Sequence, residues 1–326
     1  MEVLGFLQQN SIVFYIVIFI LGLLVGSFLN VVIYRLPLMM KHSWRSECIE
    51  YLSSDSATAN SKTADLETTD LETSGSETSG SETSSSEKSQ PETADTSETF
   101  NLSTPRSRCP ECGHLISAVE NIPLLSYIFL KGKCRQCKTS ISLRYPFIEL
   151  LSALVATFVA YQYGVSLQTL CIIPLGWALI ALTFIDFDHQ YLPDNITLPF
   201  LWLGLLVNYF GIITDLESAV IGAMLGYAVL WTMFHLFRLL TGKEGMGYGD
   251  FKLLGMLGAW LGWQMLPTII ILSSLVGSIV GITLIVLKKQ QRSKPIPFGP
   301  YLAAAGCISL IWGNEINTAY LNWIAQ

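Results

Sequence analysis

Charged residues are scarce in this chain of 326 residues: they make up 13% of the sequence, whereas hydrophobic residues make up 51%. A soluble globular domain normally carries about a quarter charged residues. The shortage excludes an ordinary soluble domain and indicates a membrane protein. No Gly-x-Gly-x-x-Gly run occurs either, so the sequence itself offers no nucleotide-binding loop of that kind.

Charge is absent from six long stretches, each long enough for the roughly 20 apolar residues of a membrane-spanning helix. Two of them are long enough to be divided, one at Tyr163-Gly164 and one around Gly262, Gln264 and Pro267. The sequence therefore predicts an all-α polytopic membrane protein with about eight spans. We place these spans at about 12–34, 146–163, 168–185, 195–213, 217–238, 251–264, 266–287 and 297–313.

Positive charge predicts the orientation of these spans. All 19 Lys and Arg fall within residues 35–145, 238–252 and 288–294, which lie on one side of an eight-span arrangement. The positive-inside rule makes that side cytoplasmic. Without the short sixth span, the cluster at 288–294 would be translocated. The first span has no basic region before it and no convincing cleavage site, so we expect it to be retained rather than removed as a signal peptide.

The chain thus divides into a first span (1–36), a cytoplasmic loop (37–145), a seven-span core (146–313) and a periplasmic tail (314–326). Within the loop, residues 52–99 are mostly Ser, Thr, Glu and Asp, and residues 52–104 hold eleven Asp or Glu and two Lys. Such a segment has too few apolar residues to fold, so we predict a disordered acidic insertion. It serves either as an inert spacer or as a binding segment.

The other part of the loop, residues 105–145, holds two cysteine pairs, Cys109-Pro-Glu-Cys112 and Cys134-Arg-Gln-Cys137. Four thiolates at this spacing suit one tetrahedral zinc ion, and a closed four-sulfur site indicates structural rather than catalytic zinc. Two disulfides are the alternative, which a cytoplasmic position disfavours. Cys48, Cys171 and Cys307 are isolated, and we expect the last two to pack within spans.

Carboxylates occur where two of the predicted spans meet the cytoplasmic side. Asp186, Asp188 and Asp194 lie between the third and fourth spans, and Asp250 opens the sixth. We predict that Asp186 and Asp250 meet, since ionisable residues at membrane depth are expensive and usually functional. Helix capping is the alternative for Asp194 and Asp250, and Asp188 is expected in a solvated turn.

The glycines before Asp250 favour a catalytic function. Gly247 and Gly249 alternate ahead of it and would let a peptide backbone approach closely. Two opposed carboxylates hold one proton between them. The ionised member can activate water to attack a peptide carbonyl, and the protonated member can supply a proton to the leaving amine.

These motifs together resemble the type IV prepilin peptidase family. Gly-Tyr-Gly-Asp250 is similar to its GxGD signature, and Asp186 matches its first catalytic position. The run from Gly26 to Pro37 (Gly-Ser-Phe-Leu-Asn-Val-Val-Ile-Tyr-Arg-Leu-Pro) looks like its N-terminal motif, and the two cysteine pairs fit its cytoplasmic loop. The acidic insertion at 52–99 departs from that pattern.

The resemblance implies an aspartyl endopeptidase of the bacterial inner membrane that removes basic leaders from prepilins and pseudopilins of type IV pili or type II secretion. It also implies N-methylation of the new amine with S-adenosylmethionine, and membrane lipid but no nucleic acid as a partner. Candidate contacts for the methyl donor are Glu120, Asn121, Lys133 and Arg144, with ordinary loop structure as the alternative.

Asp188, Glu244 and the insertion are candidates to attract basic leaders, and unchanged leader binding at low salt after deletion of 52–99 would exclude the insertion. Competing interpretations are a non-enzymatic membrane scaffold, a proton-relaying transporter and a peptidase without methylation. A transporter should carry carboxylates near mid-membrane and inverted repeats, whereas here the carboxylates lie at one face.

Overall fold

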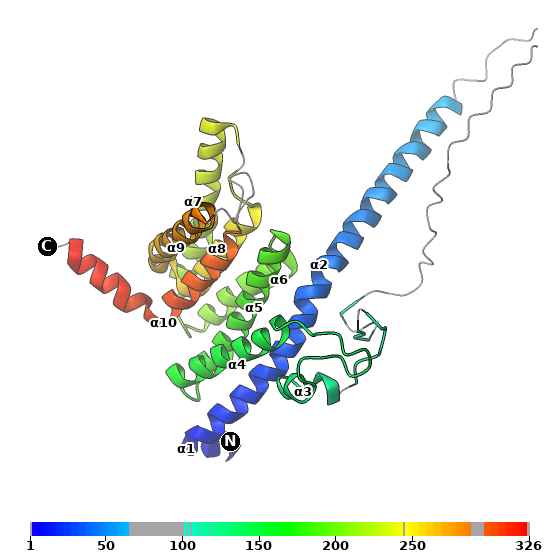
Figure 1. Cartoon of the computed structure of the whole chain (residues 1–326). Helices are drawn as coiled ribbons and strands as arrows, with labels where there is room; N and C mark the ends of the chain where they lie inside the picture. The colour runs from blue at the N-terminus through cyan, green and yellow to red at the C-terminus, as the bar shows by residue number, and fades with distance from the viewer. Residues whose placement is uncertain are drawn as a thin grey trace, which may run out of the picture. The chain divides into compact units, whose positions relative to one another are not determined.

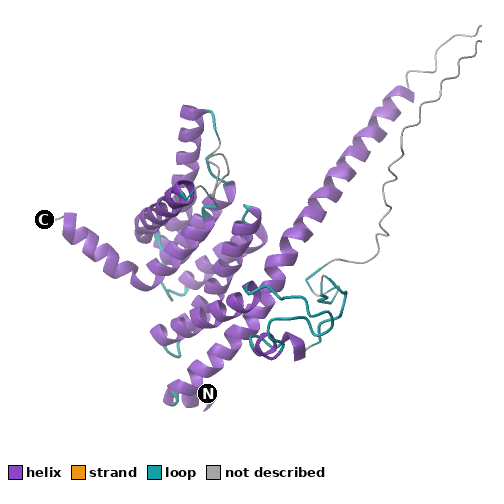
Figure 2. Cartoon of the chain, in the orientation of Figure 1, coloured by secondary structure: helices purple, strands orange, loops and turns teal. Residues whose placement is uncertain are grey.

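The computed structural model describes residues 2–64, 101–287 and 297–324, apart from 103, 105, 110, 118 and 244. The described residues are mainly helical and form no strand (Figure 2). The chain divides into two compact units, Met1–Pro37 with Arg106–Gln326, and Leu38–Pro105. Most of the predicted acidic insertion, from residue 65 on, lies outside the described residues, as does Glu244.

Each predicted span coincides with a helix (Figure 1). These helices are α2 (Ser11–Ala64), α4 (Arg144–Tyr163), α5 (Leu167–His189), α6 (Asp194–Tyr209), α7 (Leu216–Thr241), α8 (Tyr248–Leu261), α9 (Leu266–Val286) and α10 (Gly299–Ile324). The shorter elements are α1 (Glu2–Gln9), η1 (Val119–Asn121), α3 (Leu125–Phe129) and η2 (Trp263–Met265).

Five helical segments of the described chain are long and apolar enough to cross a membrane: Ser11–Ser53, Arg144–Tyr163, Leu167–His189, Leu216–Thr241 and Trp263–Val286. The chain is therefore a helical membrane protein. Helices α6 and α8 are shorter, with 16 and 14 residues, so the full count of eight spans does not follow from helix length and hydropathy.

Glycine ends two helices where the sequence predicted a break. Gly164 follows α4 with a φ of 61°, and Gly262 follows α8 with a φ of 81°, a left-handed region that favours glycine. Both breaks are confirmed. Two other boundaries differ from expectation, because α2 continues through Pro37 to Ala64 and α10 continues to Ile324.

The added lengths of α2 and α10 contain neither glycine nor a second proline. A change from apolar to polar residues predicts where a membrane ends, but it does not by itself terminate a helix. Helix α2 therefore includes the start of the segment for which disorder was predicted, residues 52–64, and α10 includes most of the predicted tail.

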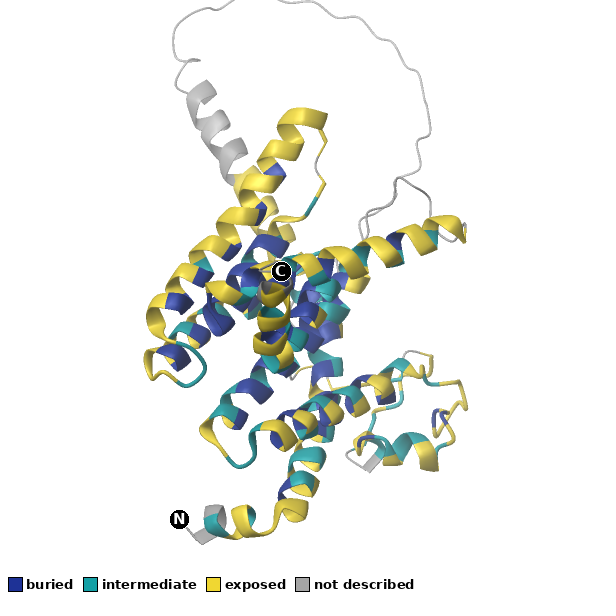
Figure 3. Ribbon diagram, turned by 90° about the vertical axis from the view of Figure 1, so that its left-hand side faces the viewer, coloured by how far each residue is buried: buried dark blue, intermediate teal, exposed yellow. Residues whose placement is uncertain are grey.

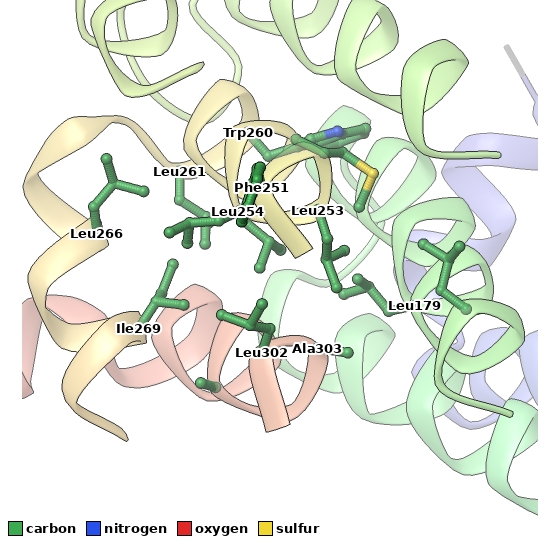
Figure 4. Close-up of a cluster of buried hydrophobic side chains, with 14 of the residues drawn as sticks. Leu179, Phe251, Leu253, Leu254, Trp260, Leu261, Leu266, Ile269, Leu302 and Ala303 are labelled. Carbon is green, nitrogen blue, oxygen red and sulfur yellow. The ribbon is translucent and has the colours of Figure 1, made fainter. Parts of the chain in front are cut away.

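The core of the first unit lies around α8, which α6, α7 and α10 contact (Figure 3). Eleven of its fourteen residues are buried, as expected for a helix that is apolar on all sides. Figure 4 shows Phe251, Leu254 and Trp260 among side chains of α9 and α10. The Asn208 amide donates to the Ala259 carbonyl at 2.8 Å and fixes α6 to the end of α8.

Helix α2 packs closely against α4 through Gly26, the one glycine of the predicted N-terminal motif. A Cβ atom at Gly26 would lie 2.7 Å from the Glu149 Cα, which is too close for any other residue. One turn further along α2, the Asn30 amide donates to the Tyr145 carbonyl at 3.2 Å. This part of the motif thus joins α2 to the start of α4.

Candidate functional site

Asp186 and Asp250 come together although 64 positions separate them in the sequence. Asp186 lies in the last turn of α5, and Asp250 lies in the first turn of α8. Their exposed fractions are only 5% and 6%, and their carboxylates are close enough to interact electrostatically. The structure thus places two carboxyl groups in one site that is largely buried from solvent.

Leu192 and Gly299 lie next to the two carboxylates. The Gly299 amide, at the start of α10, donates to Asp186 Oδ2 at 2.9 Å. A Cβ atom at Gly299 would lie 2.7 Å from that oxygen and 3.3 Å from Leu192 Cδ2, and one at Gly249 would lie 2.8 Å from Leu192 Cβ. Leu192 therefore fills the space between the backbones that adjoin Asp186 and Asp250.

The remaining aspartates of this region have cation partners. Arg144 donates to both oxygens of Asp188, at 2.9 and 2.5 Å, and the Lys252 ammonium lies 2.7 Å from both oxygens of Asp194. Asp188 is exposed, as expected from the sequence, but it lies in the last turn of α5 and forms an ion pair rather than lying in a turn between helices. Among the described residues, no cation forms an ion pair with Asp186 or Asp250.

The capping alternative fails for both aspartates to which it applied. Asp194 and Asp250 lie inside the first turns of α6 and α8, whose caps are Pro193 and Gly247, and neither helix has a side-chain cap. Asp215 does cap a helix, because its carboxylate accepts from the Ser218 amide of α7 at 2.8 Å. The Asp250 carboxylate thus has no capping function.

The glycines before Asp250 permit close approach rather than an unusual backbone. Gly247 has extended angles, with φ −81° and ψ 147°, and Gly249 is not among the residues with positive φ. A Cβ atom at Gly247 would lie 3.8 Å from Asp250 Oδ2. Gly249 packs closely against Leu192, and the approach of a peptide to this strip stays a prediction.

The four predicted metal ligands form one cluster. The Sγ atoms of Cys109, Cys112, Cys134 and Cys137 all lie within 4.8 Å of one another. The Cys109–Cys137 and Cys112–Cys134 pairs are 3.8 and 4.0 Å apart, too long for a disulfide, whose sulfurs lie about 2.05 Å apart. Four sulfurs at about 2.3 Å from a tetrahedral zinc lie about 3.8 Å from one another, so these residues fit the ion.

The two halves of the cluster have the same backbone turn. Cys109 N donates to the His114 carbonyl, and Gly113 N donates back to Cys109. In the second half, Cys134 N donates to Thr139 and Lys138 N donates back to Cys134. A hydrogen bond with Thr139 lowers the pKa of Cys137 to about 6, whereas burial and hydrogen bonds with the other three cysteines raise the pKa of Cys112 to about 11.

Two of the four candidate methyl-donor residues are occupied by structural contacts. The Glu120 carboxylate accepts from the Ser117 amide at 2.9 Å and lies 3.6 Å from Arg135. The hydrogen bond from the Ser117 backbone lowers the pKa of Glu120 to about 2. Arg144 pairs with Asp188. Asn121 and Lys133 lie at the loop surface.

The sequence interpretation missed Gly299, Leu192 and the pairing of Lys252 with Asp194. A glycine followed by proline, Gly299-Pro300, opens a predicted span and could have indicated a backbone that must approach another group. Nothing in the sequence indicates that Leu192 would lie beside Asp186. Cys171 and Cys307 pack against the apolar core as predicted.

Comparison with known proteins finds two family descriptions along the chain. Residues 20–163 match the bacterial peptidase A24 N-terminal domain, and residues 173–282 match the type IV leader peptidase family.

Curated relatives carry the name prepilin leader peptidase/N-methyltransferase. The protein from Stutzerimonas stutzeri is 46% identical over 318 residues, covering 98% of this chain and 97% of the relative. The proteins from Aeromonas salmonicida and Pseudomonas aeruginosa are 50% and 46% identical, with coverage of 95% and 99% of both chains. No solved structure matches the chain.

Proposed function

The chain belongs to the type IV leader peptidase family and is a prepilin leader peptidase and N-methyltransferase, and we propose that Asp186 and Asp250 carry out the cleavage. The observation that supports this assignment is the isolation of these two carboxylates. They are buried together without a cation partner among the described residues, whereas Asp188 and Asp194 are ion-paired.

The carboxylate pair acts by sharing a proton. Two like charges in a dry site cannot both ionise easily, so one carboxyl stays protonated. The ionised carboxylate takes a proton from water, and the resulting nucleophile attacks the scissile carbonyl carbon. The protonated carboxyl hydrogen-bonds the developing oxyanion. When the C–N bond breaks, a proton passes to the leaving amine. The pair titrates as one unit, so neither acid receives a fixed role.

The groups around the pair hold it in place. The Gly299 amide fixes one oxygen of Asp186, and Leu192 keeps water from the side facing α8 and α10. A Cβ atom at Gly247 would have no neighbour nearer than 3.8 Å, so this glycine leaves room for an extended peptide backbone beside Asp250. In type IV prepilins and pseudopilins, a basic leader joins an apolar helix at the cytoplasmic face of the inner membrane. The peptide at this junction is the proposed occupant of the site.

The test of this function uses the full chain in liposomes with a prepilin and S-adenosylmethionine, followed by mass analysis of the product. We expect Asp186→Asn and Asp250→Asn each to abolish leader removal. Asp215→Asn is the matched control, because asparagine also caps helices and Asp215 lies in a different turn. Full cleavage by a folded Asp250→Asn variant would contradict the catalytic assignment.

The mass of the product also tests methylation. S-adenosylmethionine is the proposed co-substrate, and the mature chain should gain one methyl group. Asn121 and Lys133 are the candidate residues that structural contacts leave accessible. A mature chain without the methyl group would favour a peptidase without methylation.

The cysteine cluster is proposed to hold one structural zinc ion that fixes residues 105–145. Elemental analysis of the purified chain should give one zinc per protein, which Cys137→Ser should remove. Cys48→Ser is the control, because Cys48 is exposed on α2 and is not one of the four clustered cysteines. Full zinc content in Cys137→Ser would contradict the site, and four oxidised cysteines in the native chain would favour disulfides.

A further inference from the structure

The short helix α3 exposes large apolar side chains in a part of the chain that connects two membrane helices. Ile128 and Phe129 have exposed fractions of 68% and 81%, and Leu125 is also exposed. Exposed apolar side chains gathered in this way usually mark an interaction surface. The five residues of α3 contain no buried residue, so the helix does not serve the core.

Helix α3 lies beside the first turns of the membrane helix α4. The Leu124 amide, just before α3, donates to Glu149 Oε2 at 2.9 Å, and Glu149 lies in the second turn of α4. With 20 residues, α4 is about 30 Å long, which equals the thickness of the hydrocarbon core of a bilayer. The first turns of α4 therefore lie at the boundary between lipid headgroups and acyl chains, and α3 lies beside them.

Between Glu120 and Glu149, all charged residues of the sequence that contains α3 are positive. Residues 121–148 contain five Lys or Arg and no Asp or Glu. Two of these cations are paired, Arg135 with Glu120 and Arg144 with Asp188. Lys131 and Lys133, which follow α3 directly, are exposed. Apolar side chains next to lysines are the pattern of a segment that binds an anionic membrane surface.

We propose that α3 docks onto the anionic phospholipid surface of the membrane in which the chain is embedded. Ile128 and Phe129 insert at the headgroup boundary, and Lys131 and Lys133 contact lipid phosphates. This docking fixes the cysteine cluster against the membrane face beside the start of α4. It concerns residues outside the carboxylate site and does not depend on the catalytic assignment.

The test is amide hydrogen exchange of the full chain, one copy per nanodisc, in phosphatidylglycerol or phosphatidylcholine discs. We expect residues 124–132 to exchange about tenfold more slowly in phosphatidylglycerol, since exchange reports local opening, and the difference to shrink in high salt. The double variant Ile128→Ser and Phe129→Ser should lose the protection. Leu115→Ser is the matched control, because Leu115 is 46% exposed in the same loop but outside α3.

Three outcomes decide the proposal. Slow exchange in phosphatidylglycerol that the double variant loses, with the Cys109 and Cys134 amides unchanged, establishes docking by a folded loop. If the Cys109 and Cys134 amides exchange faster in the double variant, the loop has unfolded. The variant Lys131→Gln with Lys133→Gln is then used instead and should abolish the lipid dependence. Equal exchange in both lipids, or protection that needs two copies per disc, overturns the proposal, the latter in favour of self-association.

Discussion

At the scale of single residues, four aspartates near one end of the helical bundle differ in their partners. Asp188 and Asp194 form ion pairs with Arg144 and Lys252. Asp186 and Asp250 are buried near each other without a cation partner among the described residues. Of these four aspartates, the two without a cation partner are thus the two that are proposed to share a proton in catalysis.

The Lys252–Asp194 ion pair leads to a prediction about positioning. Lys252 lies two residues after Asp250, and its pairing fixes the first turn of α8 to the first turn of α6. We expect Lys252→Met to lower kcat for leader removal about fivefold and to leave KM nearly unchanged, since a half-exposed ion pair is worth about 1 kcal/mol at most. Steady-state kinetics with a prepilin in liposomes measure both constants.

Exchanging the two charges provides the control for this prediction. The double variant Asp194→Lys with Lys252→Asp keeps an ion pair and should recover part of kcat, which a loss of folding would not. An unchanged kcat in Lys252→Met would show that the pair does not position Asp250.

The sequence was sufficient to predict that the four cysteines lie together and that Asp186 and Asp250 meet. The spacing of the cysteines and the order of the spans bring these residues together. It was not sufficient for the ion pairs. Arg144 and Asp188 are 44 positions apart, and Lys252 and Asp194 are 58 apart. Such pairings depend on the rotation of each helix about its axis, which a pattern of apolar stretches does not determine.

At the scale of secondary-structure elements, glycines set the distance between α7 and α8. A Cβ atom at Gly226 would lie 2.6 Å from the Leu254 carbonyl oxygen, and one at Gly258 would overlap the carbonyl of Gly222. Small residues repeated along one face allow membrane helices to approach closely, and Gly222 and Gly226 of α7 lie against Gly258 and Gly255 of α8, respectively. The sequence shows both pairs, but it does not show that they face each other.

This close approach predicts that Gly258→Ala separates α7 from α8. The added methyl group meets backbone atoms, which cannot rotate away, so we expect about 1–3 kcal/mol of destabilisation. Because α8 carries Asp250, leader removal should fall as well. Thermal unfolding of the detergent-solubilised chain and the cleavage assay measure the two effects.

Gly5→Ala is the matched control, since Gly5 is also helical and no atom lies within 4 Å of a Cβ placed there. It should leave the unfolding temperature unchanged or raise it slightly, because alanine favours a helix more than glycine does. Equal stability of Gly258→Ala and Gly5→Ala would show that the two helices can adjust to a wider spacing.

At the scale of the whole molecule, charge and burial explain why eight spans are proposed where length and hydropathy identify five. Helix α8 is about 21 Å long, shorter than the hydrocarbon core of a bilayer, yet it is surrounded by other helices. A helix without lipid contact need not match the bilayer thickness. The distribution of Lys and Arg, all on one side when α8 counts as a span, supports the proposed division into a first span, a cytoplasmic loop and a seven-span core.

This topology can be tested by labelling single introduced cysteines with a membrane-impermeant maleimide in intact cells. If α8 spans the membrane, the loop after α9 is cytoplasmic, and Ser293→Cys should react only in inverted vesicles. Phe210→Cys, in the turn after α6, should react in intact cells and serves as the control. The native cysteine cluster lies on the cytoplasmic side in this arrangement and should not react from outside. Labelling of Ser293→Cys in intact cells would place four cations outside, against the positive-inside rule, and would show that α8 does not cross the membrane.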